Sequence, residues 1–323
     1  TAPISASASV NPVCSGNSTV LSYSGGTAGT GATAEWYSGS CGGTYVGSGN
    51  NLSVTPSGSI TYYVRYEGDC NNSSCAQVTV NSATNSTPPT SATASTNPIC
   101  PGNSTTLSYS GGSLGTGATA EWYSGSCGGT YVGTGNNISV SPSSATTYYV
   151  RFEGDCNNTS CESVTVNMKT NSVPPLSVSA TVNPVCSGDP TVLSFSGGTA
   201  GTGASAEWYS GSCGGTYVGS GNNLTVNPIS NTTYYVRYEG DCNTTSCTSI
   251  SISTAVGSDP TITSAGPFCE TDASVTLNAA DPGGSWSGSG IVDASTGEFD
   301  PGNAGPGDHT ISYTISGICT SSD

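Results

Sequence analysis

The residue types best able to do chemistry in this sequence are cysteine, the carboxylates and a single histidine. The chain has 14 Cys and 20 Asp+Glu, but only 4 Lys+Arg and 1 His among its 323 residues. Thiols form disulfides or bind metal ions, and paired carboxylates serve as acid and base in glycoside hydrolysis. Each of these chemistries requires its own residue spacing, so the spacing decides among them.

The cysteine spacing favours disulfides over a metal site. The cysteines form three sets of four and one pair, C-x-x-C does not occur, and His309 lies in the segment with the fewest cysteines. Zinc sites use closely spaced Cys and His ligands, whereas an even, patterned set in a chain poor in Lys and Met is typical of an oxidising compartment. We therefore expect disulfides, no metal and no cofactor.

The carboxylates and the histidine predict structural roles. Glu35, Glu67 and Asp69 recur along the chain, but Glu67 and Asp69 are close in sequence to Arg65. An ion pair between Arg65 and a carboxylate is therefore expected instead of a glycosidase pair. His309 lies in the sequence GPGDHTISY, at the expected start of a strand, where we expect a surface or capping role. No catalytic residue is predicted, and the chain is not expected to be an enzyme.

The charge balance excludes anionic partners. The net charge is -16, and so few Lys and Arg cannot neutralise the phosphates of a nucleic acid or an anionic membrane surface. The glycine-rich run from Gly25 to Gly31 lacks the lysine and the following helix of a phosphate loop, so we expect a flexible loop there. The chain has no apolar run of about 20 residues, so we expect no direct membrane insertion.

An internal repeat determines the expected architecture. The sequence EWYSGSCGGTYVGSGNN at residues 35–51 returns at 207–223, and with one change at 121–137. The first cysteines of the three copies, Cys14, Cys100 and Cys186, are 86 residues apart. This period exceeds that of solenoids and is close to the ~100 residues of an immunoglobulin-like sandwich. We predict an all-β tandem array of such sandwiches with essentially no helix, divided into residues 1–86, 87–172, 173–257 and 258–323.

Within the first copy we predict seven short strands. Thr, Val, Tyr and Ser alternate there with turn-forming Gly and Asn, which is typical of strands joined by tight turns. Trp36 is expected in the core, and Tyr62 and Tyr63 open the sixth strand. The predicted strands are Ile4–Val10, Ser18–Tyr23, Ala32–Tyr37, Thr44–Val46, Leu52–Thr55, Thr61–Glu67 and Ala76–Asn81.

The segment 258–323 departs from the repeat and is predicted to be a divergent, acidic β domain. It holds nine Asp and Glu and no Lys or Arg, which is more than half of the net charge. Its chain stops four residues after Cys319, without a counterpart of the final strand that follows Cys75. Because the chain also lacks an initial Met and a signal peptide, we expect a mature product or a segment of a longer protein.

We expect the cysteines of each repeat to pair with one another. Cys14 and Cys41 are expected at one end of the sandwich, and Cys70 and Cys75 flank the last hairpin at the other end. The predicted pairs are Cys14–Cys41, Cys70–Cys75, Cys100–Cys127, Cys156–Cys161, Cys186–Cys213, Cys242–Cys247 and Cys269–Cys319. The last pair conflicts with the others, because its members are the counterparts of Cys14 and Cys70. That conflict leaves open a bond between the ends of one sandwich or a bond between neighbouring domains.

Three sequence patterns resemble one known family. They are C-x-G-x-S-T-x-L at Cys14–Leu21, E-W-Y-S-G-S-C-G-G at Glu35–Gly43, and T-Y-Y-V-R-x-E-G-x-C-N-x-x-x-C at Thr61–Cys75. The chain resembles the CHU_C-associated type of Ig-like domain found in very large secreted surface proteins of Bacteroidota, among them gliding-motility adhesins of the SprB type. The fourth domain resembles another module of the same proteins. The resemblance implies export by the type IX secretion system and display as a long filament.

Repetition without catalytic residues predicts a non-enzymatic segment of a repetitive, disulfide-stapled adhesin filament. We expect it at the cell surface of a Gram-negative bacterium, associated with the outer membrane, with a role in adhesion or gliding. The expected partners are other domains of the same long chain and a surface or glycan ligand. The alternative is a carbohydrate-binding or spacer region of a secreted polysaccharide-degrading enzyme, with Tyr37 and Tyr45 stacking on sugar rings. A structural surface-layer or fibre subunit is the third hypothesis.

Overall fold

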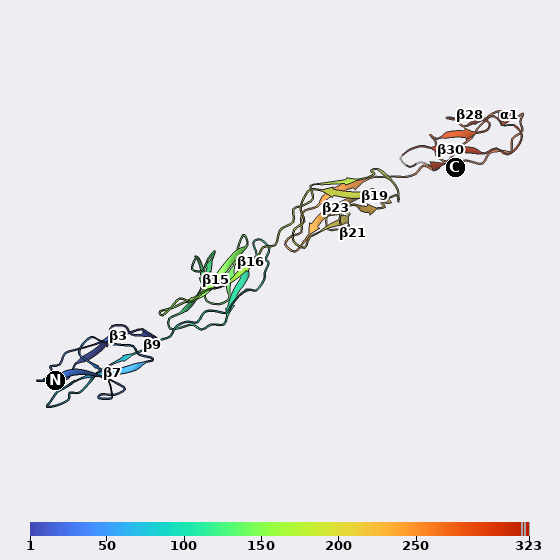
Figure 1. The fold of residues 1–323 in the computed structure, drawn as a ribbon. Coiled ribbons are helices and arrows are strands. Elements are labelled where there is room, and N and C mark those ends of the chain that lie inside the picture. Colours follow the sequence, from blue (N-terminus) through green and yellow to red (C-terminus); the bar gives the residue numbers. More distant parts are fainter. Residues whose placement is uncertain (318, 320, 323) are drawn as a thin grey trace. The chain divides into compact units, whose positions relative to one another are not determined.

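The chain is all-β, as predicted, and contains four β-sandwiches (Figure 1). A computed structural model describes residues 1–317, 319 and 321–322. Two compact units, residues 1–168 and 169–323, hold two sandwiches each, and every sandwich has a hydrophobic core of its own. Within the described residues, the helical structure is one turn, α1 (Pro301–Ala304), and no helix is long and apolar enough to cross a membrane.

The first sandwich of unit 1 packs a three-stranded sheet against a four-stranded one. The strand order is β1-β3-β6 in the first sheet and β5-β4-β7-β8 in the second, and all of these neighbours are antiparallel. The strands are β1 (Ser5–Ala8), β3 (Thr19–Ser24), β6 (Leu52–Val54), β5 (Thr44–Ser48), β4 (Thr33–Ser38), β7 (Ile60–Glu67) and β8 (Ala76–Val80). The seven predicted strands are therefore confirmed to within a few residues at their ends.

The core of the first sandwich lies between these two sheets. Alternate residues of each strand point inward, so Leu21, Trp36, Val64 and Val80 are all completely buried. The Trp36 indole N–H donates to the carbonyl oxygen of Gly49 at 2.9 Å, which satisfies its polar atom inside the core. The predicted core position of Trp36 is confirmed.

A short parallel pair of strands was not predicted. β2 (Val13–Cys14) pairs with β9 (Ser82–Ala83), with Cys14 opposite Ala83. Two residues are too few for an alternating pattern to reveal a strand. The pair places Cys14 beside the segment by which the chain leaves the sandwich.

The second sandwich of unit 1 repeats the same topology. Its sheets have the orders β10-β11-β14 and β13-β12-β15-β16, and its core contains Trp122, Leu107 and Phe152. The strands are β10 (Ser91–Ala94), β11 (Thr105–Ser110), β14 (Ile138–Val140), β13 (Thr130–Thr134), β12 (Thr119–Ser124), β15 (Thr146–Glu153) and β16 (Glu162–Val166).

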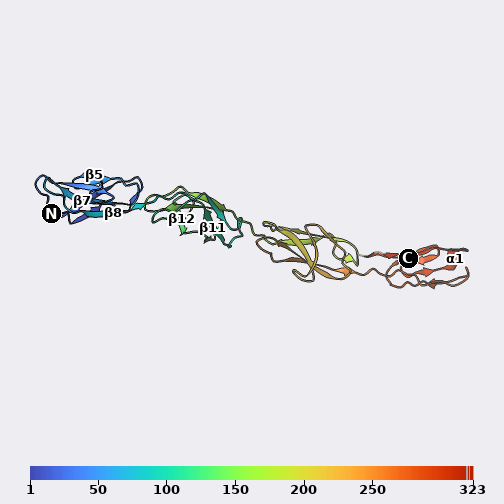
Figure 2. The same ribbon diagram turned by 90° about the horizontal axis from the view of Figure 1, so that it is seen from below.

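In unit 2, the third sandwich, which is the yellow part of the ribbon in Figure 2, has this topology as well. Its sheets are β17-β19-β22 and β21-β20-β23-β24, and β18 pairs with β25 in parallel. The strands are β17 (Ser177–Ala180), β18 (Val185–Cys186), β19 (Thr191–Ser196), β20 (Ser205–Ser210), β21 (Thr216–Ser220), β22 (Leu224–Val226), β23 (Thr232–Glu239), β24 (Thr248–Ile252) and β25 (Thr254–Ala255).

The fourth sandwich differs, with two three-stranded sheets ordered β26-β29-β28 and β27-β30-β31. Its core is built on Trp286 and Tyr313, whose ring centroids are 4.4 Å apart. His309 Nε2 lies 2.8 Å from the carbonyl oxygen of Gly305, the C-cap residue of α1, in agreement with a capping role. The strands are β26 (Val275–Thr276), β27 (Ser285–Gly288), β28 (Ile291–Asp293), β29 (Glu298–Phe299), β30 (Ile311–Ile315) and β31 (Ser321–Ser322). The two-residue β31 follows Cys319, where no strand was predicted.

The predicted cysteine pairing is wrong in every repeat. The bonds between Cys14 and Cys156, and between Cys186 and Cys319, each connect two sandwiches of one unit. The bonds within sandwiches are Cys41–Cys75, Cys127–Cys161 and Cys213–Cys247, and Cys100 and Cys242 are also disulfide-bonded. Cys70 and Cys269 are free thiols. The predicted pairs Cys14–Cys41, Cys70–Cys75, Cys100–Cys127, Cys156–Cys161, Cys186–Cys213, Cys242–Cys247 and Cys269–Cys319 are therefore all replaced.

Two local features explain the correction. The unpredicted β2 holds Cys14 beside the exit of the first sandwich, whereas Cys156 lies in the last hairpin of the second sandwich, between β15 and β16. The turn between β4 and β5 also folds back over the sheet. It lies so close to the sheet that a Cβ on Gly42 would be 2.8 Å from Arg65 Nη1. That fold carries Cys41 across the sheet to Cys75, which immediately precedes β8.

Candidate functional site

The outer face of each four-stranded sheet carries a cluster of polar and aromatic side chains. In the first sandwich, Glu35 on β4 lies opposite Arg65 on β7, and Thr33 lies opposite Glu67. Side chains alternate between the two faces of a strand, so Tyr37, two residues after Glu35, is on this same face. Strand register alone therefore brings Tyr37, Arg65 and Glu67 together on the side of the sheet away from the core.

We call Tyr37, Arg65 and Glu67 the Tyr–Arg–Glu cluster. Arg65 Nε and Nη2 contact the same carboxylate oxygen, Glu67 Oε1, at 2.7 and 2.5 Å, and the Tyr37 hydroxyl donates to that oxygen as well. The guanidinium carbon of Arg65 lies 5.0 Å from the centre of the Tyr37 ring, within cation–π range. The expected ion pair between Arg65 and a carboxylate is confirmed, and the carboxylate is that of Glu67.

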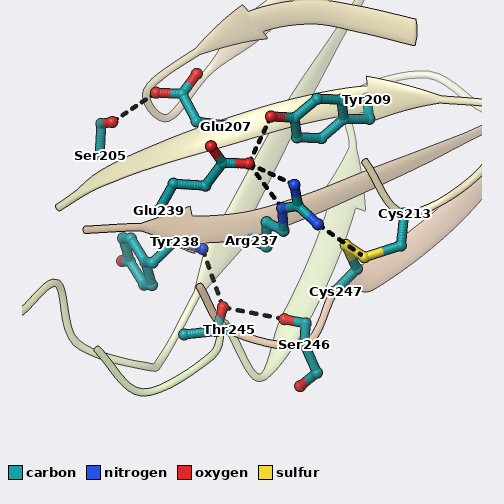
Figure 3. A network of polar contacts seen from close by, with 10 residues as sticks. All are labelled: Ser205, Glu207, Tyr209, Cys213, Arg237, Tyr238, Glu239, Thr245, Ser246 and Cys247. Atoms are coloured by element: carbon teal, nitrogen blue, oxygen red, sulfur yellow. Dashed lines mark hydrogen bonds and ion pairs between the residues drawn. A yellow bond between two sulfur atoms is a disulfide. The ribbon is translucent and has the colours of Figure 1, made fainter. Parts of the chain in front are cut away.

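The cluster occurs in all three repeats with nearly the same geometry. Figure 3 shows it in the third sandwich, where Tyr209 and Arg237 both reach the carboxylate of Glu239. Arg237 Nη1 also lies 3.8 Å from the sulfur of Cys213, so the guanidinium covers the disulfide in the neighbouring turn (Figure 3). The corresponding residues of the second sandwich are Tyr123, Arg151 and Glu153.

The cluster fixes the protonation states of its members. Hydrogen bonds from Tyr37, and then from Arg65, lower the pKa of the Glu67 carboxyl. Burial and the bond to Glu67 raise the pKa of Tyr37, and the bond to Glu67 raises that of Arg65. Glu67 is therefore an ionised partner of Arg65 at neutral pH, and its occupied oxygen is unsuited to proton transfer.

We expect this arrangement to make the three repeats sensitive to acid. The folded-state pKa of Glu67 lies below its ordinary value of 4.5, so its contribution to stability is complete above that pH and is lost as the pH falls through the folded-state pKa. The same direction holds for Glu153 and Glu239. Denaturant unfolding between pH 7 and pH 3 should show a smaller loss of stability in a Glu67→Gln, Glu153→Gln, Glu239→Gln variant than in the parent chain. Equal slopes in the two proteins would contradict this.

A disulfide fixes the turn that lies over the cluster. Cys41–Cys75 has a Cα–Cα distance of 5.9 Å and joins the turn after β4 to the residue before β8, closing a loop with a sequence separation of 34. Gly42 in this turn has φ +75°, and any Cβ there would collide with Arg65. The S-C-G-G sequence thus allows the turn to lie flat against the guanidinium.

Removing this disulfide should weaken the first sandwich substantially. The chain-entropy relation for a loop of 34 residues gives about 3–4 kcal/mol for the doubly substituted Cys41→Ser, Cys75→Ser chain. Hydrogen exchange of β7 would report the loss, with β15 of the intact second sandwich as the internal control. Unchanged protection of β7 would show that the bond contributes little.

One tyrosine of each repeat remains exposed beside the cluster. Tyr45 on β5 is 58% exposed, and its ring packs edge-on against Tyr37 at a centroid distance of 6.0 Å. Tyr131 and Tyr217 have the same exposure and the same packing in their repeats. A rigid aromatic ring with one open face is able to stack on a flat ligand such as a sugar ring.

A second repeated site is the joint between the first and second sandwiches in unit 1. Residues 84–86 leave the first sandwich and bond to two loops of the second. Thr84 N donates to Thr116 Oγ1 at 2.9 Å, and Thr116 N donates to Thr84 O at 3.0 Å. Ser86 N donates to Asn157 Oδ1 at 2.8 Å, and Asn157 Nδ2 donates to Ser86 O at 3.0 Å. Gly115 N donates to Ser86 Oγ at 2.9 Å, so the linker is held like an added strand.

The disulfide lies beside this polar joint. Cys156 immediately precedes Asn157, and its bond to Cys14 has a Cα–Cα distance of 5.5 Å. Ser86 is 6% exposed, so the joint excludes water from part of the linker. Hydrogen bonds and a covalent bond therefore hold the same two sandwiches together at one place.

Unit 2 begins with an equivalent docked linker. Thr170 pairs with Thr202, Ser172 pairs with Asn243, and Gly201 donates to Ser172 Oγ, all at 2.8–3.0 Å. Lys169 Nζ adds an ion pair with Asp241 Oδ2 at 3.0 Å. Further along the unit, Cys186–Cys319 joins the third and fourth sandwiches, with a Cα–Cα distance of 5.6 Å.

These joints were missed at the sequence level. The glycine-rich loop after β3 was expected to be flexible, yet its counterparts Gly115–Thr116 and Gly201–Thr202 bind the linkers. The usable signal was the identical Thr-Asn-Ser at residues 84–86 and 170–172, because unconstrained linkers between repeats need not keep the same residues.

Comparisons with known proteins agree with the architecture. A family model described as "Ig-like domain CHU_C associated" matches residues 1–83, 88–171 and 172–255. No curated protein matches the chain.

Among solved structures, the chain is similar to a Ca2+-stabilized adhesin that helps an Antarctic bacterium reach out and bind ice (TM-score 0.43, 15% identity, 95% of this chain and 91% of that one). It is also similar to the chicken CNTN1 FN1–FN3 domains (TM-score 0.28, 13% identity, 78% and 99%). A third similar structure is that of the Clostridium thermocellum CbhA fibronectin(III)-like modules (TM-score 0.29, 14% identity, 51% and 94%).

Proposed function

We propose that this chain, which belongs to the family of Ig-like domains described as CHU_C associated, is a non-enzymatic, load-bearing segment of a secreted cell-surface adhesin. The observation that carries the proposal is the bond between Cys14 and Cys156. Cys14 follows the first strand of one sandwich, and Cys156 lies in the last hairpin of the next. Tension that enters at β1 therefore passes through a single covalent bond to the last hairpin of the second sandwich, beside the joint.

The bond between Cys186 and Cys319 supports the same role in unit 2. It connects the beginning of the third sandwich to the end of the fourth, over a sequence separation of 133. The residues between the two cysteines of each bond lie outside the covalent path that carries the load, whereas β1, β16 and β17 remain on it. A protein that transmits force between a cell and a surface benefits from this, because the bypassed residues cannot be drawn out when it is pulled.

Solution scattering tests whether the chain is a spacer. Four sandwiches of about 35–40 Å each, placed in series, give a maximum dimension of about 150 Å and a radius of gyration above about 40 Å. A compact chain of 323 residues has a radius of gyration of about 20 Å. A measured value near the compact one would remove the basis for a spacer function. The same proposal includes export by the type IX system, attachment at the outer membrane and a role in gliding.

The exposed tyrosines favour a second candidate function, the binding of carbohydrate for a secreted polysaccharide-degrading enzyme. Tyr45, Tyr131 and Tyr217 present three equivalent rings, and each is supported from behind by the Tyr–Arg–Glu cluster of its repeat. Three weak sites on one chain act together on a polymer, so avidity makes even low-affinity stacking measurable.

A pull-down with insoluble cellulose, chitin and starch tests this second function. We expect the parent chain to bind at least one of these polysaccharides and the triple variant Tyr45→Ser, Tyr131→Ser, Tyr217→Ser to lose that binding. The matched control replaces three exposed apolar residues elsewhere on the surface, Val10→Ser, Leu114→Ser and Leu176→Ser. If both variants bind the polysaccharides as the parent does, the tyrosines are not the binding site. If the parent chain binds none of the three, the chain does not bind these carbohydrates.

A further inference from the structure

The first sandwich carries an unfilled copy of the joint. Its hairpin cysteine, Cys70, is an exposed free thiol. The equivalent cysteine of the second sandwich, Cys156, is bonded to the preceding sandwich. The two hairpins have the same form, because Gly68 N donates to Asn71 O as Gly154 N donates to Asn157 O. The surrounding loop is thus built for a bond that Cys70 does not make.

A groove lies next to Cys70 at the place where the linker lies in the second sandwich. Its volume is about 150 Å³, and Gly29, Thr30, Cys70 and Asn71 are among the residues that line it. In the second sandwich the equivalents of Gly29, Thr30 and Asn71 are Gly115, Thr116 and Asn157, all three of which bind residues 84–86. The third sandwich binds residues 170–172 through its own equivalents.

The polar groups of this groove have no partners in the first sandwich. Within the described residues, the side chains of Thr30 and Asn71 make no hydrogen bond, and both residues are exposed. Their counterparts Thr116 and Asn157 are half-buried by the linker. Equivalent residues therefore bind the linker in the second sandwich and are open to solvent in the first.

We infer that the groove and thiol of the first sandwich form a docking site for another Ig-like repeat of the same type. The site would take an extended Thr-x-Ser segment through Thr30 and Asn71, and Cys70 would bond to the first-strand cysteine of that repeat. In the reaction, two S–H bonds break and one S–S bond forms. The two electrons and the two protons pass to a disulfide oxidant, such as oxidised glutathione, whose S–S bond breaks to give two thiols. This inference rests on the internal repeat and does not require the adhesion function.

An extended chain tests the docking site. Residues 87–172 are added directly before Thr1, which places the Thr-Asn-Ser of residues 170–172 where the groove expects its ligand. The added copy carries Ile99→Val as a mass marker. After oxidation in a glutathione buffer and alkylation of free thiols, the disulfide-linked peptides are identified by mass spectrometry.

We expect Cys70 to lose its reactivity toward alkylation and to appear in a peptide linked to the marked cysteine of the added repeat. Cys269, which is free in the parent chain, is the control and should remain alkylated. The bond between Cys14 and Cys156 in the same digest reports that the chain has folded. If Cys70 is alkylated as fully as Cys269 while Cys14–Cys156 is present, the inference is wrong.

A second variant separates docking from bond formation. In the extended chain with Cys70→Ser, hydrogen exchange at residues 27–31 should be slower than in the unextended chain with the same substitution. Adding Asn71→Ala should restore the faster exchange, because Asn71 supplies two of the bonds to the linker. Equal exchange with and without the added repeat would contradict the groove as a binding site.

Discussion

Reducing the disulfides should lengthen the chain under tension by about 930 Å. The two bonds between sandwiches have sequence separations of 142 and 133 residues, and an extended chain spans about 3.4 Å per residue. In the oxidised protein these residues lie in loops outside the shortest covalent path from one end to the other. Pulling the oxidised chain by its ends in an atomic force microscope or optical trap should therefore show a short, stiff molecule. The reduced chain should show successive unfolding steps.

Two variants control this measurement. The Cys14→Ser chain loses one bypass and should lengthen without any reductant. The Cys41→Ser, Cys75→Ser chain should keep the length of the oxidised parent, because that bond lies inside the bypassed loop. Unfolding steps of equal total length in oxidised and reduced protein would show that the bonds do not carry the load.

Replacing Trp36 with alanine should destabilise the first sandwich by about 3–5 kcal/mol. The indole is completely buried, and its N–H donates to Gly49 O, so the substitution leaves a cavity and removes one internal hydrogen bond. A sandwich of some 86 residues has a small core, and a loss of this size is a large fraction of ordinary domain stability.

Hydrogen exchange localises the effect of Trp36→Ala to one sandwich. Protection should fall in β3 and β7, while β11 and β15 of the second sandwich, built around Trp122, should change little. Leu114→Ala is the matched control, since Leu114 is 50% exposed and its truncation should cost less than about 0.5 kcal/mol. Equal loss of protection in both sandwiches would indicate that they unfold as one unit.

The strands could be predicted because they depend on local sequence. Alternation of apolar and polar residues between Gly and Asn turns is visible within six residues, so β3, β4 and β7 were located almost to the residue. The core position of Trp36 followed from the sandwich pattern, and the pairing of Arg65 with a carboxylate followed from their closeness in sequence. The acidic fourth segment was recognised as a separate β domain because it departs from the repeat and differs in charge.

The disulfides and the joints could not be predicted because they depend on contacts between domains. Cys14 is placed by a two-residue strand that pairs with the departing chain, and its partner lies 142 residues away. The role of Asn157 likewise appears only when the linker from the preceding sandwich is in place. Proximity within a single repeat was therefore the wrong criterion for pairing the cysteines.

A peptide map of the unreduced protein tests the central claim most directly. Free thiols are alkylated first, the protein is digested without reductant, and electron-transfer fragmentation resolves the two cysteines of each last hairpin. The map should contain Cys14 linked to Cys156, Cys186 linked to Cys319 and Cys41 linked to Cys75, with Cys70 and Cys269 alkylated. A peptide that links Cys14 to Cys41 or to Cys70 would contradict a covalent path from one sandwich to the next.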